Sequence, residues 1–188
     1  TSTAEFRANN SARFETSCCG SEVGMVRPPP KSMHRRSQEI QRLIGRALRS
    51  IIDLKSLPDI TLWVDCDVIA ADGGTRTTSI NGACVALHDA LLALEEQKKI
   101  RNWPMRGLVS ATAVGMFQGE PLVDLDYSED SKADVDMNVV CGAEGRLIEV
   151  QGSAEGAPFE RSLFDTMLTM AQDSCMRIQD QQKQILGL

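Results

Sequence analysis

Apolar side chains recur every three or four positions in three segments of this 188-residue chain, which is the period of an amphipathic helix. The first segment begins at Ser37, the expected N-cap, and continues to Ile51. The second begins near Ser79 or Asn81, either of which can cap it. The third follows Pro158 and ends in the polar run QDQQKQ. Three helices are therefore expected, and the methionines of the third are interpreted as core residues rather than cofactor ligands.

Strand patterns occupy the segments between these helices. Residues 61–72 alternate apolar and polar side chains and end at a glycine pair. Residues 108–127 hold two β-rich runs joined by the sequence QGE, and residues 135–154 repeat that arrangement around GAEG. This order of elements predicts an α+β fold, in which a mixed sheet packs against helices.

Composition limits the kind of protein that this chain can be. The length and the 42% hydrophobic content suffice for one core, and no apolar run approaches the roughly 18 residues that a bilayer span needs. Four of the six cysteines stand singly in apolar segments, where a thiol behaves as a small hydrophobe, and this favours a reducing compartment. Cys18 and Cys19 are adjacent without CxxC spacing, which argues against structural zinc.

Basic charge is concentrated in the first expected helix. The net charge of -6 disfavours nonspecific polyanion binding by the whole surface, but charges more than about 10 Å apart are screened from one another. A local patch can therefore still bind an anion. The arginines of this segment form either such a patch or a solvated helix face: Arg35, Arg36, Arg42, Arg46 and Arg49.

The sequence DVIAADGGTRTTSINGA, residues 67–83, places two glycines, a threonine and an arginine between a strand pattern and a helix pattern. Glycines let the backbone approach a ligand closely, and the N–H groups that open a helix bind anions. Arg76 beside Thr75 adds directional donors at that point. Because GGTR is short and matches neither the GxxxxGK[ST] nor the GxGxxG motif, a purely structural turn stays open as the alternative.

Six acidic residues crowd the sequence DLDYSEDSKADVDMN. Crowded carboxylates repel one another unless cations or hydrogen bonds compensate, and Mg²⁺ is commonly held by one or two carboxylates and several waters. The spacing does not fit an EF-hand loop, so the alternatives are a magnesium site or a solvated acidic loop. His34 and His88 stand outside any recognisable nucleophile motif, which argues against a hydrolase triad.

Four segments together closely resemble the bacterial ribonuclease PH family: RRSQEIQRLIGRALRSIIDL, DCDVIAADGGTRTTSINGACVAL, DLDYSEDSKADVDMNVV and EVQGSAEGAPF. They occur in the family's order, and the resemblance covers residues 35–188. It implies a ribonuclease PH-like mixed sheet packed with helices, with an N-terminal part that is truncated or altered. We accordingly divide the chain into an irregular N-terminal segment, residues 1–33, and a catalytic domain, residues 34–188.

The resemblance also implies which residues act. The implied phosphate-binding residues are Arg36, Gly74, Thr75 and Arg76. The acidic motif maps onto Asp130 and Asp136, which resemble carboxylates that act as the general acid or hold a divalent cation.

The implied activity is phosphate-dependent 3′ to 5′ exoribonuclease trimming of tRNA precursors. The terminal nucleotide passes to inorganic phosphate, a co-substrate, and leaves as a nucleoside diphosphate in a reversible reaction with Mg²⁺. The implied assembly is a ring of six identical chains, a trimer of dimers, that binds RNA in the cytoplasm and has no membrane partner. A noncatalytic or incomplete RNA-binding ring subunit of the same fold is the alternative, and an unrelated phosphotransferase is a third.

Overall fold

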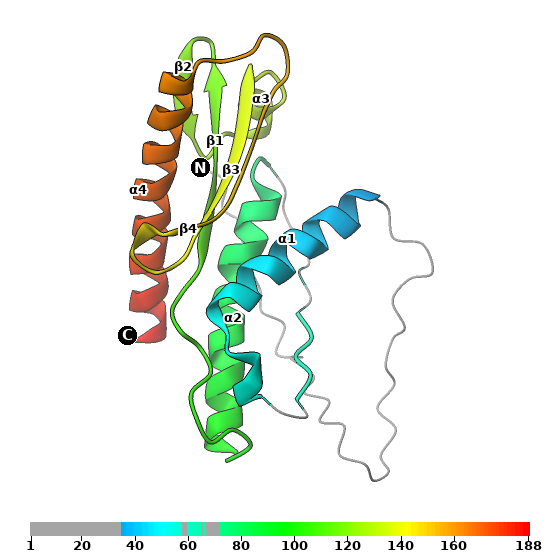
Figure 1. Cartoon of the computed structure of the whole chain (residues 1–188), viewed down its shortest axis with the longest axis vertical. Coiled ribbons are helices and arrows are strands. Elements are labelled where there is room, and N and C mark those ends of the chain that lie inside the picture. Colours follow the sequence, from blue (N-terminus) through cyan, green and yellow to red (C-terminus); the bar gives the residue numbers. More distant parts are fainter. Residues whose placement is uncertain (1–34, 58–59, 65, 67–71) are drawn as a thin grey trace.

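A computed structural model of the chain describes residues 35–57, 60–64, 66 and 72–188, with side chains from residue 38 onward (Figure 1). In these ranges the helices are α1 (Arg35–Ile51), α2 (Thr75–Glu96), α3 (Tyr127–Asp130) and α4 (Arg161–Leu186). Two short 3₁₀ helices, η1 (Leu54–Ser56) and η2 (Ala143–Gly145), accompany them.

The described strands form one antiparallel sheet. They are β1 (Ser110–Phe117), β2 (Glu120–Val123), β3 (Val135–Cys141) and β4 (Leu147–Ala154), in the order β2-β1-β3-β4. Gln118 and Gly119 connect the first hairpin, both with positive φ, so the predicted QGE connection is confirmed. The second predicted hairpin is confirmed as β3 and β4 around η2, with an irregular register after Val140.

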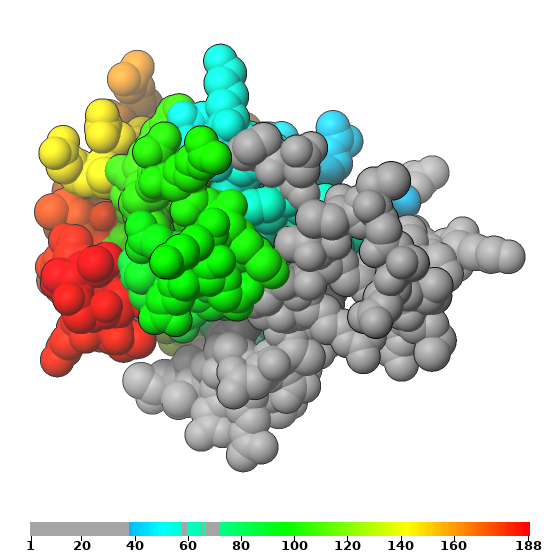
Figure 2. Space-filling view, turned by 90° about the horizontal axis from the view of Figure 1, so that it is seen from below, coloured from blue at the N-terminus to red at the C-terminus, as the bar shows by residue number. Residues whose placement is uncertain are grey.

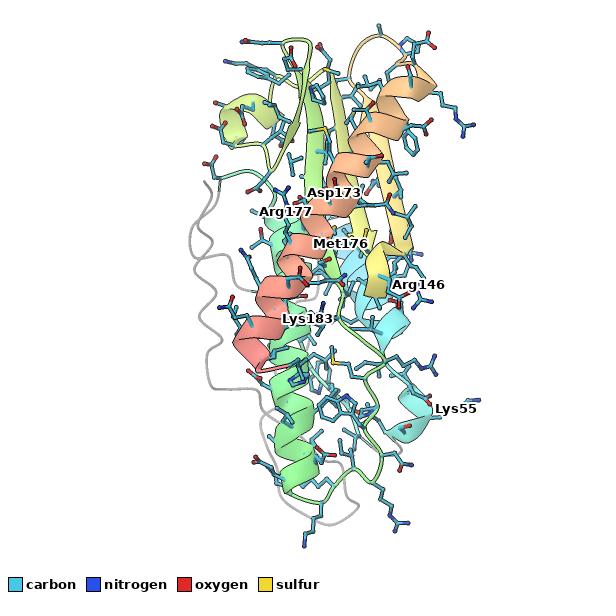
Figure 3. All side chains as sticks on the ribbon, turned by 90° about the vertical axis from the view of Figure 1, so that its left-hand side faces the viewer. Lys55, Arg146, Asp173, Met176, Arg177 and Lys183 are labelled. Atoms are coloured by element: carbon cyan, nitrogen blue, oxygen red, sulfur yellow. The ribbon has the colours of Figure 1, made fainter. Side chains whose placement is uncertain are left out.

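Helices cover both faces of this sheet. One face packs on α4, where Val114, Val139 and Met137 meet Met167 and Ala171 in an apolar cluster (Figure 3). The other face packs on α1 and α2, which share a second cluster with β1 and the segment before it. The predicted α+β fold, a sheet packed with helices, is therefore confirmed.

Buried glutamines attach the C-terminal half of α4 to the rest of the molecule. The Gln179 amide donates to the carbonyls of Cys141 and Gly142, at 3.2 and 2.9 Å. The Gln182 amide donates to the carbonyls of Asn81 and Val109, at 3.2 and 3.1 Å. Seen from below in Figure 2, the C-terminal part of α4 (red) accordingly lies alongside α2 (green).

Several sequence interpretations need correction. The α1 helix begins at Arg35, so Ser37 lies inside it. The α2 helix begins at Thr75, so Ser79 and Asn81 do not cap it. Ser79 instead donates to the carbonyl one turn earlier, and Asn81 binds the backbone of Ala111 through both its oxygen and its nitrogen. A carbonyl of the same helix uses Ser79, and a tertiary contact uses Asn81, although both side chains have the chemistry of caps.

The strand expected over residues 61–72 is not formed at the residues of that segment that can be checked. Residues 60–64 and 66 do not adopt strand structure, and the rest of the segment up to residue 71 lies outside the described residues. Alternation of apolar and polar residues within one segment favours a strand, but it does not determine whether another strand pairs with that segment.

The interpretation of the single cysteines as small apolar residues is confirmed for three of them. Cys84, Cys141 and Cys175 are buried, and burial raises the pKa of the Cys84 thiol to about 11. Cys18 and Cys19 lie outside the described residues. Within the described ranges, no helix combines the length and apolar character that crossing a membrane requires.

Candidate active site

The GGTR sequence forms the start of α2. Gly74 has φ 67° and occupies the N-cap position, where its carbonyl accepts bonds from the Thr77 and Thr78 hydroxyls, both at 2.9 Å. A positive φ favours glycine, which explains the residue. Gly74 has no side chain, so the N-cap residue itself makes no capping hydrogen bond, and no other described residue is seen to cap the helix. The N–H groups of its first turn therefore remain donors for an anion, at the positive end of the helix dipole.

This turn is fixed against the acidic segment about fifty residues later. A Cβ on Gly73 would lie 1.9 Å from the Leu125 carbonyl oxygen, so only glycine fits there. The Tyr127 N–H donates to the Asp72 carboxylate at 2.6 Å. In Figure 1 the N-terminal end of α2 accordingly points toward α3. The two motifs thus meet in space.

A capping box positions Asp130. Asp126 caps α3 by accepting the Glu129 N–H at 2.9 Å, and the Glu129 carboxylate accepts the Asp126 N–H at 3.0 Å. The Ser128 hydroxyl, which donates to Asp126, and the Glu129 N–H hold the pKa of Asp126 below its usual value. Asp130 ends this fixed turn and is exposed.

Asp136 comes from the sheet. It lies on β3 opposite Gly115 of β1 and Ser153 of β4, on the face that α1 and α2 cover. Burial raises the pKa of its carboxyl, the nearby Asp130 raises it further, Arg76 lowers it, and Glu155 raises it. Asp136 is therefore within electrostatic reach of both sequence motifs.

A cleft of about 530 Å³ opens at these acids. Its lining includes Asp130, Lys132, Asp134, Asp136, Glu155 and Gly156. Gly74, Thr75 and Arg76 are not part of that lining; Arg76 stands next to it, close enough to affect Asp136. The site therefore has an acidic cleft and a basic helix start side by side.

The N-terminal part of α1 reaches the same place. Glu39 lies 3.7 Å from the Arg76 guanidinium, between Glu39 Oε1 and Arg76 Nη1. Arg36 lies in the first turn of α1, three residues before Glu39, and its side chain lies outside the described residues. The backbone thus brings all three predicted segments to one end of the sheet.

Two sequence models of one family match the chain. The model of the 3′ exoribonuclease family, domain 1, matches residues 4–93, and that of the 3′ exoribonuclease family, domain 2, matches residues 107–174. The chain belongs to the 3′ exoribonuclease family. The division of the chain at residue 34 stays a prediction, since residues 1–34 lie outside the described residues.

A solved structure shares the family fold. The chain is similar to the crystal structure of Rrp46 from rice (Oryza sativa), with a TM-score of 0.66 and 21% identity over 84% of this chain and 68% of that chain. At this level of identity, the structural match establishes a common fold alone.

The acidic side of the site has carboxylate oxygens of the kind that ligate Mg²⁺. In the described part of the chain, no group of three His, Cys, Asp or Glu side chains is arranged to hold a metal. Mg²⁺ needs only one or two carboxylates when waters and phosphate oxygens complete its shell. The repulsion that Asp130 and Glu155 exert on Asp136 is the kind that such a cation relieves.

Two acidic residues of the site were not predicted from the sequence. Glu155 affects Asp136 and lines the cleft, although it lies in the quoted segment EVQGSAEGAPF. Glu39 contacts Arg76, although it lies in the quoted segment RRSQEIQRL. An isolated acid within an arginine-rich helix start was the available signal for Glu39.

Proposed function

We propose that this chain is a phosphate-dependent 3′ to 5′ exoribonuclease that transfers the terminal nucleotide of an RNA to inorganic phosphate. One observation carries the proposal: Arg76, at the uncapped start of α2, acts electrostatically on Asp136, which shares a cleft with Asp130. An anion-binding group and an acid therefore stand side by side, as the attack of one phosphate on another requires.

The proposed phosphate site combines backbone and side-chain donors. Gly74 and Thr75 bring the first N–H groups of α2, and Arg76 brings a guanidinium that can bind two phosphate oxygens at once. Arg36 completes the set from α1. These groups offset the repulsion between two anions as they converge.

The proposed reaction exchanges one phosphorus–oxygen bond for another. An oxygen of inorganic phosphate attacks the phosphorus of the last linkage, and the bond from that phosphorus to the 3′ oxygen of the preceding nucleotide breaks. The leaving 3′ oxygen takes a proton and becomes the new RNA end, and the product is a nucleoside diphosphate. Asp136 suits the proton donor, because its raised pKa keeps a larger protonated fraction near neutral pH. Since the phosphodiester bond that breaks and the phosphoanhydride bond that forms in the diphosphate are of comparable energy, the reaction runs in both directions.

Mg²⁺ is part of the proposal. As the alternative to the proton-donor role of Asp136, Asp130 and Asp136 in their ionised form would hold the ion, and when bound it would neutralise charge on the phosphate oxygens of the substrate.

The finer assignment follows the four matching segments. We propose a ribonuclease PH of the bacterial type that trims tRNA precursors and takes part in RNA processing in the cytoplasm. We further propose that it assembles as a homohexameric ring.

The test is an RNA shortening assay with and without phosphate. The full chain should release nucleoside diphosphates only when phosphate is present. Arg76→Gln should lower kcat/KM for phosphate by about 10- to 100-fold, because a charged hydrogen bond is worth roughly 1.5–3 kcal/mol. Arg106→Gln is the matched control, since Arg106 carries the same charge but pairs with Asp53 in an exposed loop.

Other outcomes discriminate between the alternatives. Release of nucleoside monophosphates without phosphate would contradict phosphorolysis. Binding of RNA without any turnover, at any phosphate concentration, would favour the noncatalytic ring subunit.

A further inference from the structure

Arg76 is shared between two carboxylates. Its guanidinium lies 3.7 Å from Glu39 on α1, and it also lowers the pKa of Asp136 on β3. The Arg76 side chain is 27% exposed, so these acids compensate a charge that is largely withdrawn from water. A phosphate that binds Arg76 therefore comes close to two acidic side chains, Glu39 and Asp136.

Glu39 is the more easily displaced of the two acids. It is 53% exposed, and its distance to Arg76 is longer than a hydrogen bond. Its other contact, a hydrogen bond to Oε1 from the Gln151 amide, is long as well, at 3.4 Å. Asp136, in contrast, is half buried in the sheet. Glu39 can therefore withdraw into water without leaving a buried charge unpaired.

We propose that Glu39 is a positioning residue that holds Arg76 while the phosphate site is empty and whose charge opposes phosphate binding. This inference rests on the proposed function, because it concerns the same anion site. Glu39 loses its partner when phosphate takes the guanidinium. It then repels the bound anion and, after reaction, the diphosphate product at the same position.

Glu39→Gln separates charge from shape. The amide oxygen of the variant still accepts from Gln151, but the negative charge beside Arg76 is gone. Removal of one unit charge near a partly hydrated anion site should tighten phosphate binding by about three- to tenfold. High salt screens this interaction, so the difference from the wild type should shrink toward 1 M salt.

The measurement is equilibrium dialysis of radiolabelled inorganic phosphate against the full chain, at low and at high salt. Glu149→Gln is the matched control, because Glu149 has the same charge and joins α1 to the same sheet through Arg46 at 2.6 Å. That variant should bind phosphate within about twofold of the wild type. Glu39→Asp, which keeps the charge, should also stay close to the wild type. The KM for phosphate should follow the dialysis result in Glu39→Gln.

The outcomes separate the two proposals. If the wild type binds phosphate and Glu39→Gln binds it equally or more weakly, the role of Glu39 is overturned and the proposed function stands. If tightening occurs but is as large in Glu149→Gln, it reflects net charge, and the role is again overturned. If the wild type binds no phosphate, the proposed function and the role of Glu39 both fail.

Discussion

On the face of the sheet that α4 covers, β3 presents Val135, Met137 and Val139, all of them buried in one apolar cluster. On the opposite face the same strand presents Asp136 and Asn138, which look toward α1 and α2. Successive side chains of a strand point to opposite faces, so one strand serves both purposes. The α4 face is arranged for packing, and the other face accepts a half-buried carboxylate that packing alone does not require.

This difference indicates where stability and activity can be separated. A carboxylate with a raised pKa destabilises the native state when it is ionised, and such costs concentrate at functional sites. An apolar cluster carries no such cost. Substitutions on the two faces should therefore have opposite consequences, and the predictions below are ordered by the size of the expected effect.

The largest effect is expected on the polar face. Asp136→Asn should lower kcat for phosphorolysis on the order of 10²–10³, because an amide cannot supply the proton or hold a cation. The melting temperature should stay the same or rise. Single-turnover assays with saturating phosphate, paired with thermal unfolding, measure both quantities. Loss of activity together with loss of folding would remove the contrast between the two faces.

The apolar face should respond in the reverse way. Met167→Ala removes a side chain that is 0% exposed, and the free energy of unfolding should fall by about 2–5 kcal/mol. The activity of the molecules that remain folded should be unchanged. Met176→Ala is the control on the same helix (Figure 3), since Met176 is 48% exposed, and it should cost little. Urea unfolding measures the free energy of unfolding of both variants, and phosphorolysis assays run in parallel measure their activity.

A third prediction follows from the pH dependence of stability. The pKa of Asp136 is raised in the folded state above its ordinary value of 3.8, so ionisation of this group destabilises the fold. The stability advantage of Asp136→Asn should be greatest above the folded pKa and should disappear as the pH falls toward 3.8. Urea unfolding of both proteins between pH 4 and 8 measures it. A constant difference across that range would mean that the titration of Asp136 does not cause it.

The smallest effect is expected at an ion pair on the rim of the polar face. Arg46 is 55% exposed and pairs with Glu149 at 2.6 Å. Arg46→Gln should lower the free energy of unfolding by about 1 kcal/mol, because the half-exposed Arg46 gains little in water although the Glu149 side chain, 20% exposed, loses its cation. The loss should shrink in high salt, and urea unfolding at two salt concentrations checks it. A larger, salt-independent loss would show that Arg46 acts through packing.

Much of the fold could be predicted because its signals are local. The period of apolar residues located α1, α2 and α4, and alternation with a short glycine connection located the hairpin of β1 and β2. The failures occurred where a local signal needed a partner. Ser79 and Asn81 have the chemistry of caps, but neighbouring backbone carbonyls and β1 use them instead.

The candidate site divides in the same way. Gly74, Thr75 and Arg76 were predicted to bind an anion at a helix start, and the structure places them at the start of α2. The contribution of Glu39 and Glu155 was not predictable from spacing, since each lies far in sequence from the residue that it affects.

The sequence by itself determined the elements, the glycine turn and the residue types that an anion and an acid require, because periodicity and backbone freedom are properties of neighbouring residues. Only the tertiary structure decided that α2 begins beside the acidic segment, that Asp136 faces α1 and α2 rather than α4, and that Glu39 stands against Arg76. Those relations depend on sheet register and helix packing, which bring together charges tens of residues apart and thereby set their energies.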